Sequence, residues 1–369
     1  MNTQQKNNGS DKIAGLPTFN LILADGSREG HLFANGNMQV GVVINIIATT
    51  AMAEKPIFLS PEQLDSIELI DKITHEKLPI EWEYDSEENG YLHQIPISHT
   101  GARDAHLHSG KNLSSNAEAP QQKIYWLKTK KIGTITITAR VTLDGKTFSA
   151  DDMAHTGSHL VITSYKPIVY HADNFEFITE KSVANGTYDV KLHSDQSTPG
   201  PPGHNIINRI NHLPWIQNNY YIIPKKESGY PVHDIGEIRN TINDNNPTQY
   251  DYRRFTHHTR AEHLYLWFLW GQYSAKRTAG ADYRHFFNYE RWNKKEVTLD
   301  ATPQVEITTT PRVDVVSLSR LYFESPYPGF WVDESNQIPQ FKLHDIYGNE
   351  SVVLKIIMDD ADTFHLQEG

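Results

Sequence analysis

The sequence predicts an all-β protein made of at least two antiparallel β-sandwich domains, immunoglobulin-like or jelly-roll-like, with very little helix. Three observations lead to this fold class. Apolar and polar residues alternate along many segments, five dipeptides have the composition of tight hairpin turns, and no long segment repeats with the period of an α-helix. The five dipeptides are Asp25-Gly26, Asn35-Gly36, Asn89-Gly90, Asp144-Gly145 and Asn185-Gly186.

The clearest strand is the stretch "TITITARVTL" at residues 134–143. Its apolar side chains recur at every second position, and they are Ile135, Ile137, Ala139, Val141 and Leu143. Side chains at alternate positions lie on one face of a strand, so we expect this face to be buried. Asp144-Gly145 follows directly and favours positive φ at both turn residues, which predicts that the chain folds back as a hairpin.

Two further segments predict particular elements. Residues Leu264–Trp270 are all apolar, a run that is short for a helix and favours a central strand of the second domain, with a helix as the alternative. Ser60, Pro61 and Gln63 supply an N-cap, a first-turn proline and a capping-box partner. These three residues predict a helix of one or two turns between strands.

The length of 369 residues allows two domains, each with its own core. The prolines of Ser194–Asn205 resist both helix and central strand, so this stretch is the predicted linker. The predicted organisation is a disordered polar tail at 1–14, an N-terminal sandwich at 15–193 with a polar loop at 100–122, the linker at 194–205 and a C-terminal β domain at 206–369.

Two stretches carry a family resemblance. Residues 33–46 ("FANGNMQVGVVINI") and 343–356 ("LHDIYGNESVVLKI") each join an Asn-Gly or Gly-Asn turn to an alternating strand. Both resemble hairpins of the bacterial immunoglobulin-like modules found in surface adhesins. The resemblance implies a sandwich fold and implies no activity.

Composition excludes several classes of function. The net charge of -11 and the lack of a basic stripe argue against a nucleic-acid partner, which needs clustered Lys and Arg. The absence of cysteine excludes disulfides, thiolate zinc sites and cysteine nucleophiles. No apolar run approaches the ~18 residues of a membrane-spanning helix, and the N-terminus lacks the pattern of a cleavable signal peptide. We expect an extracellular, cell-surface or particle-associated protein, with a cytoplasmic location as the alternative.

Histidines raise the question of a metal. His106 and His108 lie two positions apart with Asp104 nearby, and on a strand both imidazoles would share one face. The surrounding residues are those of a polar loop, so a solvated loop is the favoured interpretation and a zinc site the alternative. Calcium bound by loop oxygens at 333–337 or 345–350 is a second alternative, since turns use the same residues. We therefore expect no cofactor.

Aromatic residues are abundant, with 18 tyrosines and 7 tryptophans. The stretch "SPYPGFWVDESNQ" at 325–337 combines two prolines and a glycine with three aromatic side chains, which predicts an exposed loop. Aromatic rings beside amides and carboxylates are typical of carbohydrate sites and of protein interfaces. The candidate ligand-binding residues are Tyr327, Phe330, Trp331, Asp333, Asn336, Trp215 and Asn218.

Three functions remain open from the sequence. The favoured one is a non-enzymatic interaction or structural protein of bacterial secreted type that binds a protein partner or assembles with itself. A carbohydrate-binding module or lectin is the alternative. A toxin or hydrolase with a site assembled from distant loops is the third, although neither a G-x-S-x-G elbow nor an H-E-x-x-H motif is present.

Overall fold

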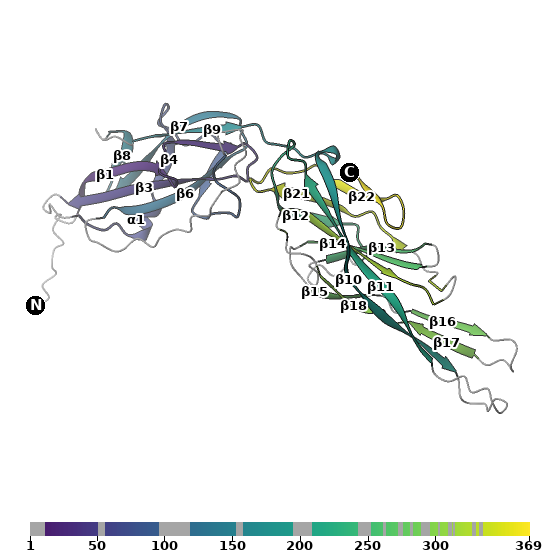
Figure 1. Ribbon diagram of the computed structural model, residues 1–369. Coiled ribbons are helices and arrows are strands. Elements are labelled where there is room, and N and C mark those ends of the chain that lie inside the picture. Colours follow the sequence, from purple (N-terminus) through teal and green to yellow (C-terminus); the bar gives the residue numbers. More distant parts are fainter. Residues whose placement is uncertain are drawn as a thin grey trace, which may run out of the picture. The chain divides into compact units, whose positions relative to one another are not determined.

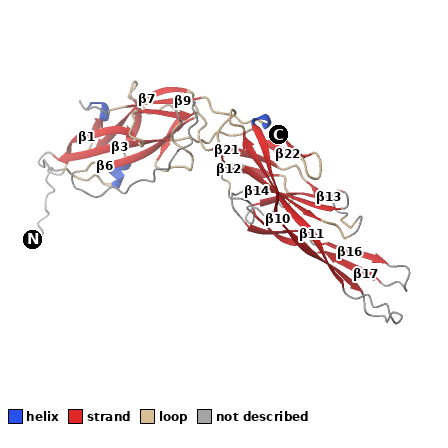
Figure 2. Cartoon of the chain, in the orientation of Figure 1, coloured by secondary structure: helices blue, strands red, loops and turns tan. Residues whose placement is uncertain are grey.

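The computed structural model describes residues 12–50, 56–95, 119–152, 158–194, 209–242, 252–260, 263–271, 276–280, 283–288, 296–301, 303–308, 312, 314–326, 330–331 and 335–369. The chain divides into two compact units. Unit 1 comprises Met1–Ile168 together with Tyr347–Asn349, and unit 2 comprises Val169–Ile346 together with Glu350–Gly369. The regular secondary structure of the described residues is almost entirely strand, as predicted (Figure 2).

Unit 1 contains two sheets (Figure 1). The first has the order β1 (Ile13–Leu23), β3 (Val40–Thr50), β6 (Gln121–Thr129) and β5 (Trp82–Asp85). The second has the order β2 (Glu29–Phe33), β9 (Leu160–Tyr165), β7 (Gly133–Leu143) and β4 (Glu68–Asp71), with β8 (Lys146–Ser149) also paired to β7. One α-helix, α1 (Pro61–Asp65), and a 3-10 helix, η1 (Ala150–Asp152), complete the described elements.

The strand order of unit 1 is that of an immunoglobulin constant-type sandwich. Taken along the chain, β1, β3, β6 and β5 occupy the positions of strands A, B, E and D, while β4, β7 and β9 occupy C, F and G. Strand β2 pairs with β9 in parallel, from Glu29 opposite Val161 to Phe33 opposite Tyr165. The predicted sandwich is therefore present in the N-terminal part of the chain.

Local sequence signals decide several elements of unit 1. The five alternate apolar residues of β7, from Ile135 to Leu143, are all buried. Asp144 and Gly145 both have positive φ, at 49° and 81°, and close the β7–β8 hairpin as predicted. At α1, the Ser60 hydroxyl accepts from the Gln63 N–H while the Gln63 side chain accepts from the Ser60 N–H. This is the predicted capping box.

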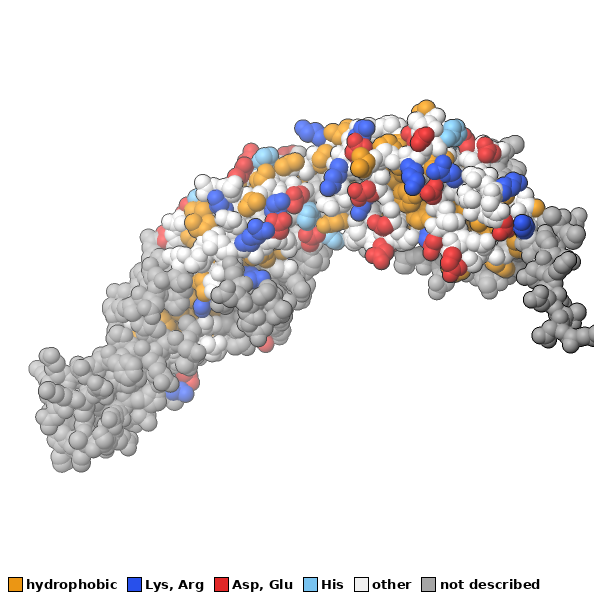
Figure 3. Space-filling model, turned by 180° about the vertical axis from the view of Figure 1, so that it is seen from behind, with side chains coloured by type: hydrophobic (Ala, Val, Ile, Leu, Met, Phe, Trp, Pro, Cys, Tyr) orange, Lys and Arg blue, Asp and Glu red, His pale blue; other side chains and the backbone are white. Residues whose placement is uncertain are grey.

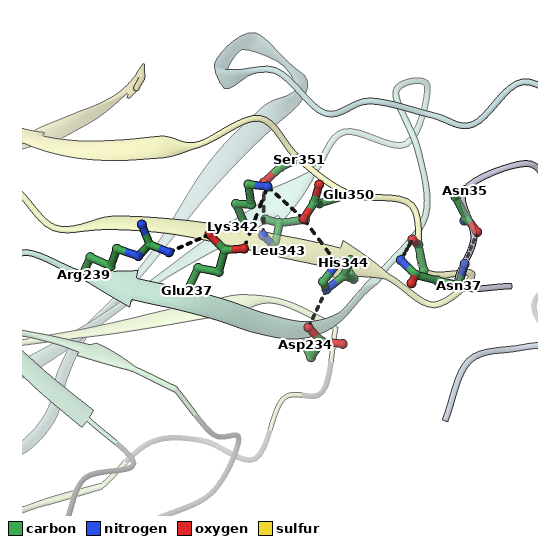
Figure 4. Close-up of polar contacts among 11 residues, drawn as sticks. Asn35, Asn37, Asp234, Glu237, Arg239, Lys342, Leu343, His344, Glu350 and Ser351 are labelled. Atoms are coloured by element: carbon green, nitrogen blue, oxygen red, sulfur yellow. Dashed lines mark hydrogen bonds and ion pairs between the residues drawn. The ribbon is translucent and has the colours of Figure 1, made fainter. Parts of the chain in front are cut away.

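Of the second stretch that resembles a bacterial immunoglobulin-like hairpin, Tyr347–Asn349 belong to unit 1, and there they contact the first stretch. The Asn35 side-chain amide donates to the carbonyl of Tyr347 at 2.9 Å and to Asn349 Oδ1 at 3.0 Å. The Asn37 side-chain amide donates to the carbonyl of Gly348 at 2.9 Å (Figure 4). Asn349 is fully buried, so these amides satisfy backbone groups that have left solvent.

Unit 2 is built on a large sheet, here called sheet E. Its order is β16 (Tyr283–Asn288), β17 (Glu296–Ala301), β10 (Phe175–Ser194), β11 (Arg209–Pro224), β19 (Val316–Phe323), β14 (His263–Trp270), β13 (Tyr252–Arg260) and β20 (Ser335–Asn336). A second sheet, sheet F, has the order β12 (Val232–Arg239), β21 (Gln340–Asp345), β22 (Leu354–Met358) and β23 (Phe364–Glu368). Strands β15 (Lys276–Gly280) and β18 (Gln304–Thr308) form a third sheet, and η2 (Ala172–Asn174) precedes β10.

The domain boundary differs from the predicted one. The predicted linker, Ser194–Asn205, lies between β10 and β11, which pair antiparallel from Phe175 opposite Pro224 to Leu192 opposite Arg209. Its prolines therefore separate two strands of one hairpin, and the division of the chain falls at Ile168/Val169. The predicted tail also ends earlier than expected, because β1 begins at Ile13, and residues 1–11 lie outside the described residues. Of the predicted loop at 100–122, residues 100–118 lie outside the described residues, and β6 begins at Gln121.

Asn185-Gly186 was expected to form a turn and instead lies within β10. Gly186 is opposite Trp215, and a Cβ at Gly186 would approach the Trp215 Nε1 to 2.8 Å. The glycine is required here because the indole lies against the neighbouring strand, a use of strand glycine that the dipeptide signal does not distinguish from a turn.

The predicted central strand is confirmed. Strand β14 pairs with β13 on one side and β19 on the other, and its residues from Leu266 to Trp270 are buried on both faces. One face belongs to the core cluster of unit 2. The members of this cluster are Tyr188, Val190, Leu264, Leu266, Phe268, Trp270, Ala301, Val305, Ile307, Leu321, Phe323, Phe330 and Trp331.

A buried polar network interrupts this apolar face. Asn219 Oδ1 accepts from the Ser319 hydroxyl at 2.7 Å and from the Gln217 side-chain amide at 2.8 Å. The Ser319 oxygen in turn accepts from Trp270 Nε1 at 2.8 Å. All four side chains are at most 2% exposed. The network joins β11, β19 and β14, and it fixes their register because a slipped strand would leave these groups unpaired in the core.

We predict that Asn219→Ala destabilises unit 2 by about 2–3 kcal/mol, since it leaves the buried donors of Ser319 and Gln217 without this acceptor. The measurement is urea unfolding followed by tryptophan fluorescence. Asn211→Ala is the matched control, because Asn211 is an exposed asparagine on the same strand and its loss is expected to change stability by less than about 0.5 kcal/mol. Equal effects of the two substitutions would contradict a stabilising role for the network.

Candidate functional site

The structure places the described members of the predicted aromatic site in the core. Phe330 and Trp331 lie between strands, as expected for a loop, but they are 0% and 2% exposed. Their rings pack edge to face at 4.7 Å within the core cluster, and the half-buried Trp215 packs against the same cluster. The expected exposure of Phe330 and Trp331 is therefore wrong, because both rings belong to the core cluster of unit 2.

The remaining candidates lie apart or outside the described residues. Asn336 is exposed on β20, whereas Asn218 is 7% exposed and its Oδ1 accepts from the Ser182 N–H at 2.8 Å. Tyr327 and Asp333 lie outside the described residues, as do all three predicted metal ligands, which are Asp104, His106 and His108. Ligand binding by these residues stays a prediction.

The structure presents a different candidate surface at the edge of sheet E. Strand β10 pairs with β11 along almost its whole length, but on its other side only Val190–Ser194 pair with β17. Among the described residues, no strand pairs with the other edge of β10 between Phe175 and Asp189. A long sheet edge of this kind presents main-chain N–H and C=O groups that another strand can pair with.

Apolar side chains gather on this open part of β10. Phe177, Ile178 and Val183 are 43%, 41% and 41% exposed. Phe177 also packs edge to face on Phe364 of β23 at 5.2 Å, so its ring is held in place while much of it faces solvent. Exposed apolar residues on consecutive positions place hydrophobic surface on both faces of the edge.

A bulge limits the open edge. The register between β10 and β11 shifts between Glu180 and Ala184, and Ser182 has a φ of 55°. The Ser182 N–H is bonded to Asn218 Oδ1, which stabilises the bulge. A bulge bends a strand and interrupts pairing, so the regular part of the edge runs from Phe175 to Glu180.

A second candidate is a row of charged side chains on sheet F. Figure 4 shows His344 and Lys342 of β21 between acidic side chains of β12 and of the turn that follows β21. His344 Nδ1 is 2.8 Å from Asp234 Oδ1, and Lys342 Nζ is 3.0 Å from Glu350 Oε1. Figure 3, which views the molecule from behind, likewise shows basic and acidic side chains interspersed on the described residues. In this row each basic side chain lies beside an acidic one, so the row does not form a patch of a single charge.

The environment of His344 is that of an ion pair. Its hydrogen bond with Asp234 raises the pKa of the imidazole, burial opposes this, and the charges of Asp234, Glu350 and Asp345 add to the rise. An Asp–His pair is also half of a hydrolase triad. Here, however, His344 Nε2 faces the Glu350 carboxylate at 3.7 Å. A carboxylate in that position stabilises the imidazolium and supplies no hydroxyl proton for a base to remove.

Two further classes of site receive no support within the described residues. No group of three or more His, Asp or Glu side chains there is arranged to hold a metal ion. No helix in the described parts of the chain has the length and apolar character to cross a bilayer.

Fold and surface together define an all-β protein of two units, the first with immunoglobulin-type strand order and the second with a sheet edge that no strand of the described residues pairs with. Comparison of the chain with protein families, with curated proteins and with solved structures gave no match. The functional proposals therefore depend on the geometry of the described residues.

We predict that His344 makes stability depend on pH. A histidine whose pKa is raised on folding contributes its full stabilisation below its ordinary value of 6.5, and this is lost as the pH rises through the folded value. His344→Gln should therefore lower the free energy of unfolding by about 1 kcal/mol at pH 6 and by less at pH 8, measured by urea unfolding. The control is His212→Gln, because His212 is also 2.8 Å from a carboxylate but is 64% exposed. A pH-independent difference for His344→Gln would refute the assignment.

Proposed function

We propose that this protein is a non-enzymatic interaction protein, of the secreted, cell-surface or particle-associated type, that assembles with a second copy of itself through the open edge of β10. The observation that carries the proposal is the run from Phe175 to Thr179, where no strand of the described residues pairs with the outer edge of β10 and where Phe177 and Ile178 are exposed. Main-chain groups of an edge strand are satisfied by another extended backbone, and apolar side chains on it add affinity.

A second copy fits this edge because identical strands can pair antiparallel about a two-fold axis. In such a pair, each residue faces its symmetry-related position counted from the centre. Centring the pair on Phe177 places the two phenylalanines opposite each other and Glu176 opposite Ile178 of the second copy. The paired stretch then runs from Phe175 to Thr179 and ends before the bulge at Ser182.

Charge selects this register over its neighbour. Centring on Ile178 would place Glu176 opposite Glu180 of the second copy at both ends of the contact. Like charges directly opposite each other destabilise a sheet. The register centred on Phe177 avoids this and pairs aromatic with aromatic.

A second candidate function, carbohydrate recognition, is favoured by a different observation on sheet E. Tyr265 of β14 and Tyr322 of β19 are directly opposite each other, with ring centroids 5.5 Å apart, and the His263 ring is 5.1 Å from that of Tyr322. The three side chains are partly exposed. Rows of aromatic rings on a sheet face are suited to contact with the apolar faces of sugars.

We predict that Ile178→Glu weakens self-association by about tenfold, since it places like charges opposite Glu176 of the second copy twice and removes apolar contact. Ile178→Lys should retain association, because the same positions then carry opposite charges. The measurement is sedimentation velocity over a range of protein concentrations, with circular dichroism to verify folding.

Ile124→Glu is the matched control, because Ile124 of β6 is also 41% exposed and lies in unit 1. It should leave association unchanged. A wild-type protein that stays monomeric at high concentration would overturn the proposal. Equal loss with Ile178→Glu and Ile178→Lys would overturn the register.

A further inference from the structure

Arg320 of β19 holds its guanidinium in a largely buried position. Its side chain is 12% exposed, and its buried Nε has no hydrogen-bond partner among the described residues. The ion pair from Nη1 to Asp362 Oδ2 is 3.6 Å long, which is beyond hydrogen-bond distance. An arginine carries five N–H donors, and buried donors are nearly always satisfied. The guanidinium therefore has donor capacity left; because Nε itself is enclosed, an acceptor from outside would reach the Nη atoms beside Asp362.

Aromatic side chains surround this guanidinium. Arg320 lies opposite Trp267 of β14, and the next pair along the same face is Tyr322 with Tyr265. The Arg320 guanidinium carbon is 5.5 Å from the Tyr265 ring centroid. His263 follows beyond Tyr265 on β14, with its ring against that of Tyr322. Charge and apolar ring surface thus occur together on one face of sheet E.

Hydrogen bonding also orders this corner. His263 Nδ1 accepts from the Ser325 N–H at 3.2 Å, which fixes the orientation of the imidazole. The Tyr322 hydroxyl is a hydrogen-bond donor at neutral pH, since the ordinary pKa of a tyrosine is 10.0, and burial together with the charge of Glu324 raises the pKa further. The rings are therefore positioned and carry donors of their own.

We propose that Arg320, Tyr265 and Tyr322 form a site for a carboxylate-bearing sugar, such as a uronic acid residue. The carboxylate would bind the two Nη atoms of the guanidinium, whose planar geometry matches a carboxylate bidentately. The sugar ring would lie against the tyrosines. This inference rests on carbohydrate recognition as the second proposed function and adds the chemical class of the ligand.

Asp362 gives the proposal a specific consequence. Its carboxylate is 58% exposed and is the side-chain acid that faces Arg320. A ligand carboxylate has to compete with it for the same guanidinium. Removing the charge of Asp362 therefore strengthens binding of an acidic sugar, whereas a purely structural role for the Arg320–Asp362 pair gives no such gain.

Titration calorimetry with the full chain tests the ligand class, using glucuronate, glucose and acetate as probes. Glucuronate is expected to bind at least about tenfold more tightly than the other two, because only it offers both the carboxylate and the ring. Equal binding of glucose and glucuronate would retain carbohydrate recognition and overturn the acidic class. Equal binding of acetate and glucuronate would overturn the sugar assignment and leave a site for anions. No binding of any probe would overturn both the acidic-sugar site and carbohydrate recognition, and would not affect the self-association proposal.

Two variants locate the site. Arg320→Lys keeps the charge but loses the fork and should weaken glucuronate binding about tenfold, while Asp362→Asn should strengthen it about threefold. Arg140→Lys is the control, because Arg140 forms a close ion pair with Glu68 in unit 1 and should leave binding unchanged. Asp362 is exposed, so Asp362→Asn decides the matter even if Arg320→Lys fails to fold. Unchanged or weaker binding in Asp362→Asn would overturn the assignment.

Discussion

The pairing of β10 with β11 is the constraint on which unit 2 depends. It runs from Phe175 opposite Pro224 to Leu192 opposite Arg209 and places β11 between β10 and β19. Every strand on the far side, including the buried β14, takes its register from this ladder through β19. Because the hairpin is longer than the contact of β10 with β17, it also leaves part of β10 without a second neighbour among the described residues. The pairing of β10 with β11 thus accounts both for the register of sheet E and for the candidate interface on β10.

Many of the aromatic side chains of the chain are buried in the core on the two faces of this sheet. Trp267 packs against Tyr220 at 4.8 Å on one face, while Trp270, Phe323 and Phe330 belong to the cluster on the other. A large sheet buried on both faces needs bulky side chains at alternate positions of its central strands. An aromatic count therefore indicates core volume before it indicates ligand binding, and the rings that remain partly exposed carry more functional information.

Local signals in the sequence were sufficient for local structure. Asp144-Gly145 and the Ser60 capping box specify their own geometry within a few residues, and the length of Leu264–Trp270 together with its uniform apolarity is sufficient for a central strand. The same type of signal failed at Asn185-Gly186, because the residue that requires the glycine, Trp215, is distant in sequence. Tertiary contacts, which single-sequence patterns do not contain, decide such cases.

The candidate sites were not predictable for the same reason. His344 acquires its properties from Asp234, and Arg320 from Tyr265 and Asp362, all distant in the chain or on other strands. The open edge of β10 is likewise a property of the whole sheet, since it depends on where β17 stops pairing. The exposed Phe177 and Ile178 have ordinary strand residues as their sequence context.

Asn219 and Arg320 are two largely buried polar side chains on sheet E that differ in how completely their hydrogen-bonding groups are satisfied. Asn219 lies among apolar side chains and is fully engaged, since it accepts from both Ser319 and Gln217. Arg320 lies on a neighbouring strand and retains a buried donor without a partner among the described residues. Burying an unpaired donor costs about 1–3 kcal/mol of folding stability. An apolar residue at this position would not carry that cost. We therefore assign Arg320, and not Asn219, to the proposed ligand site.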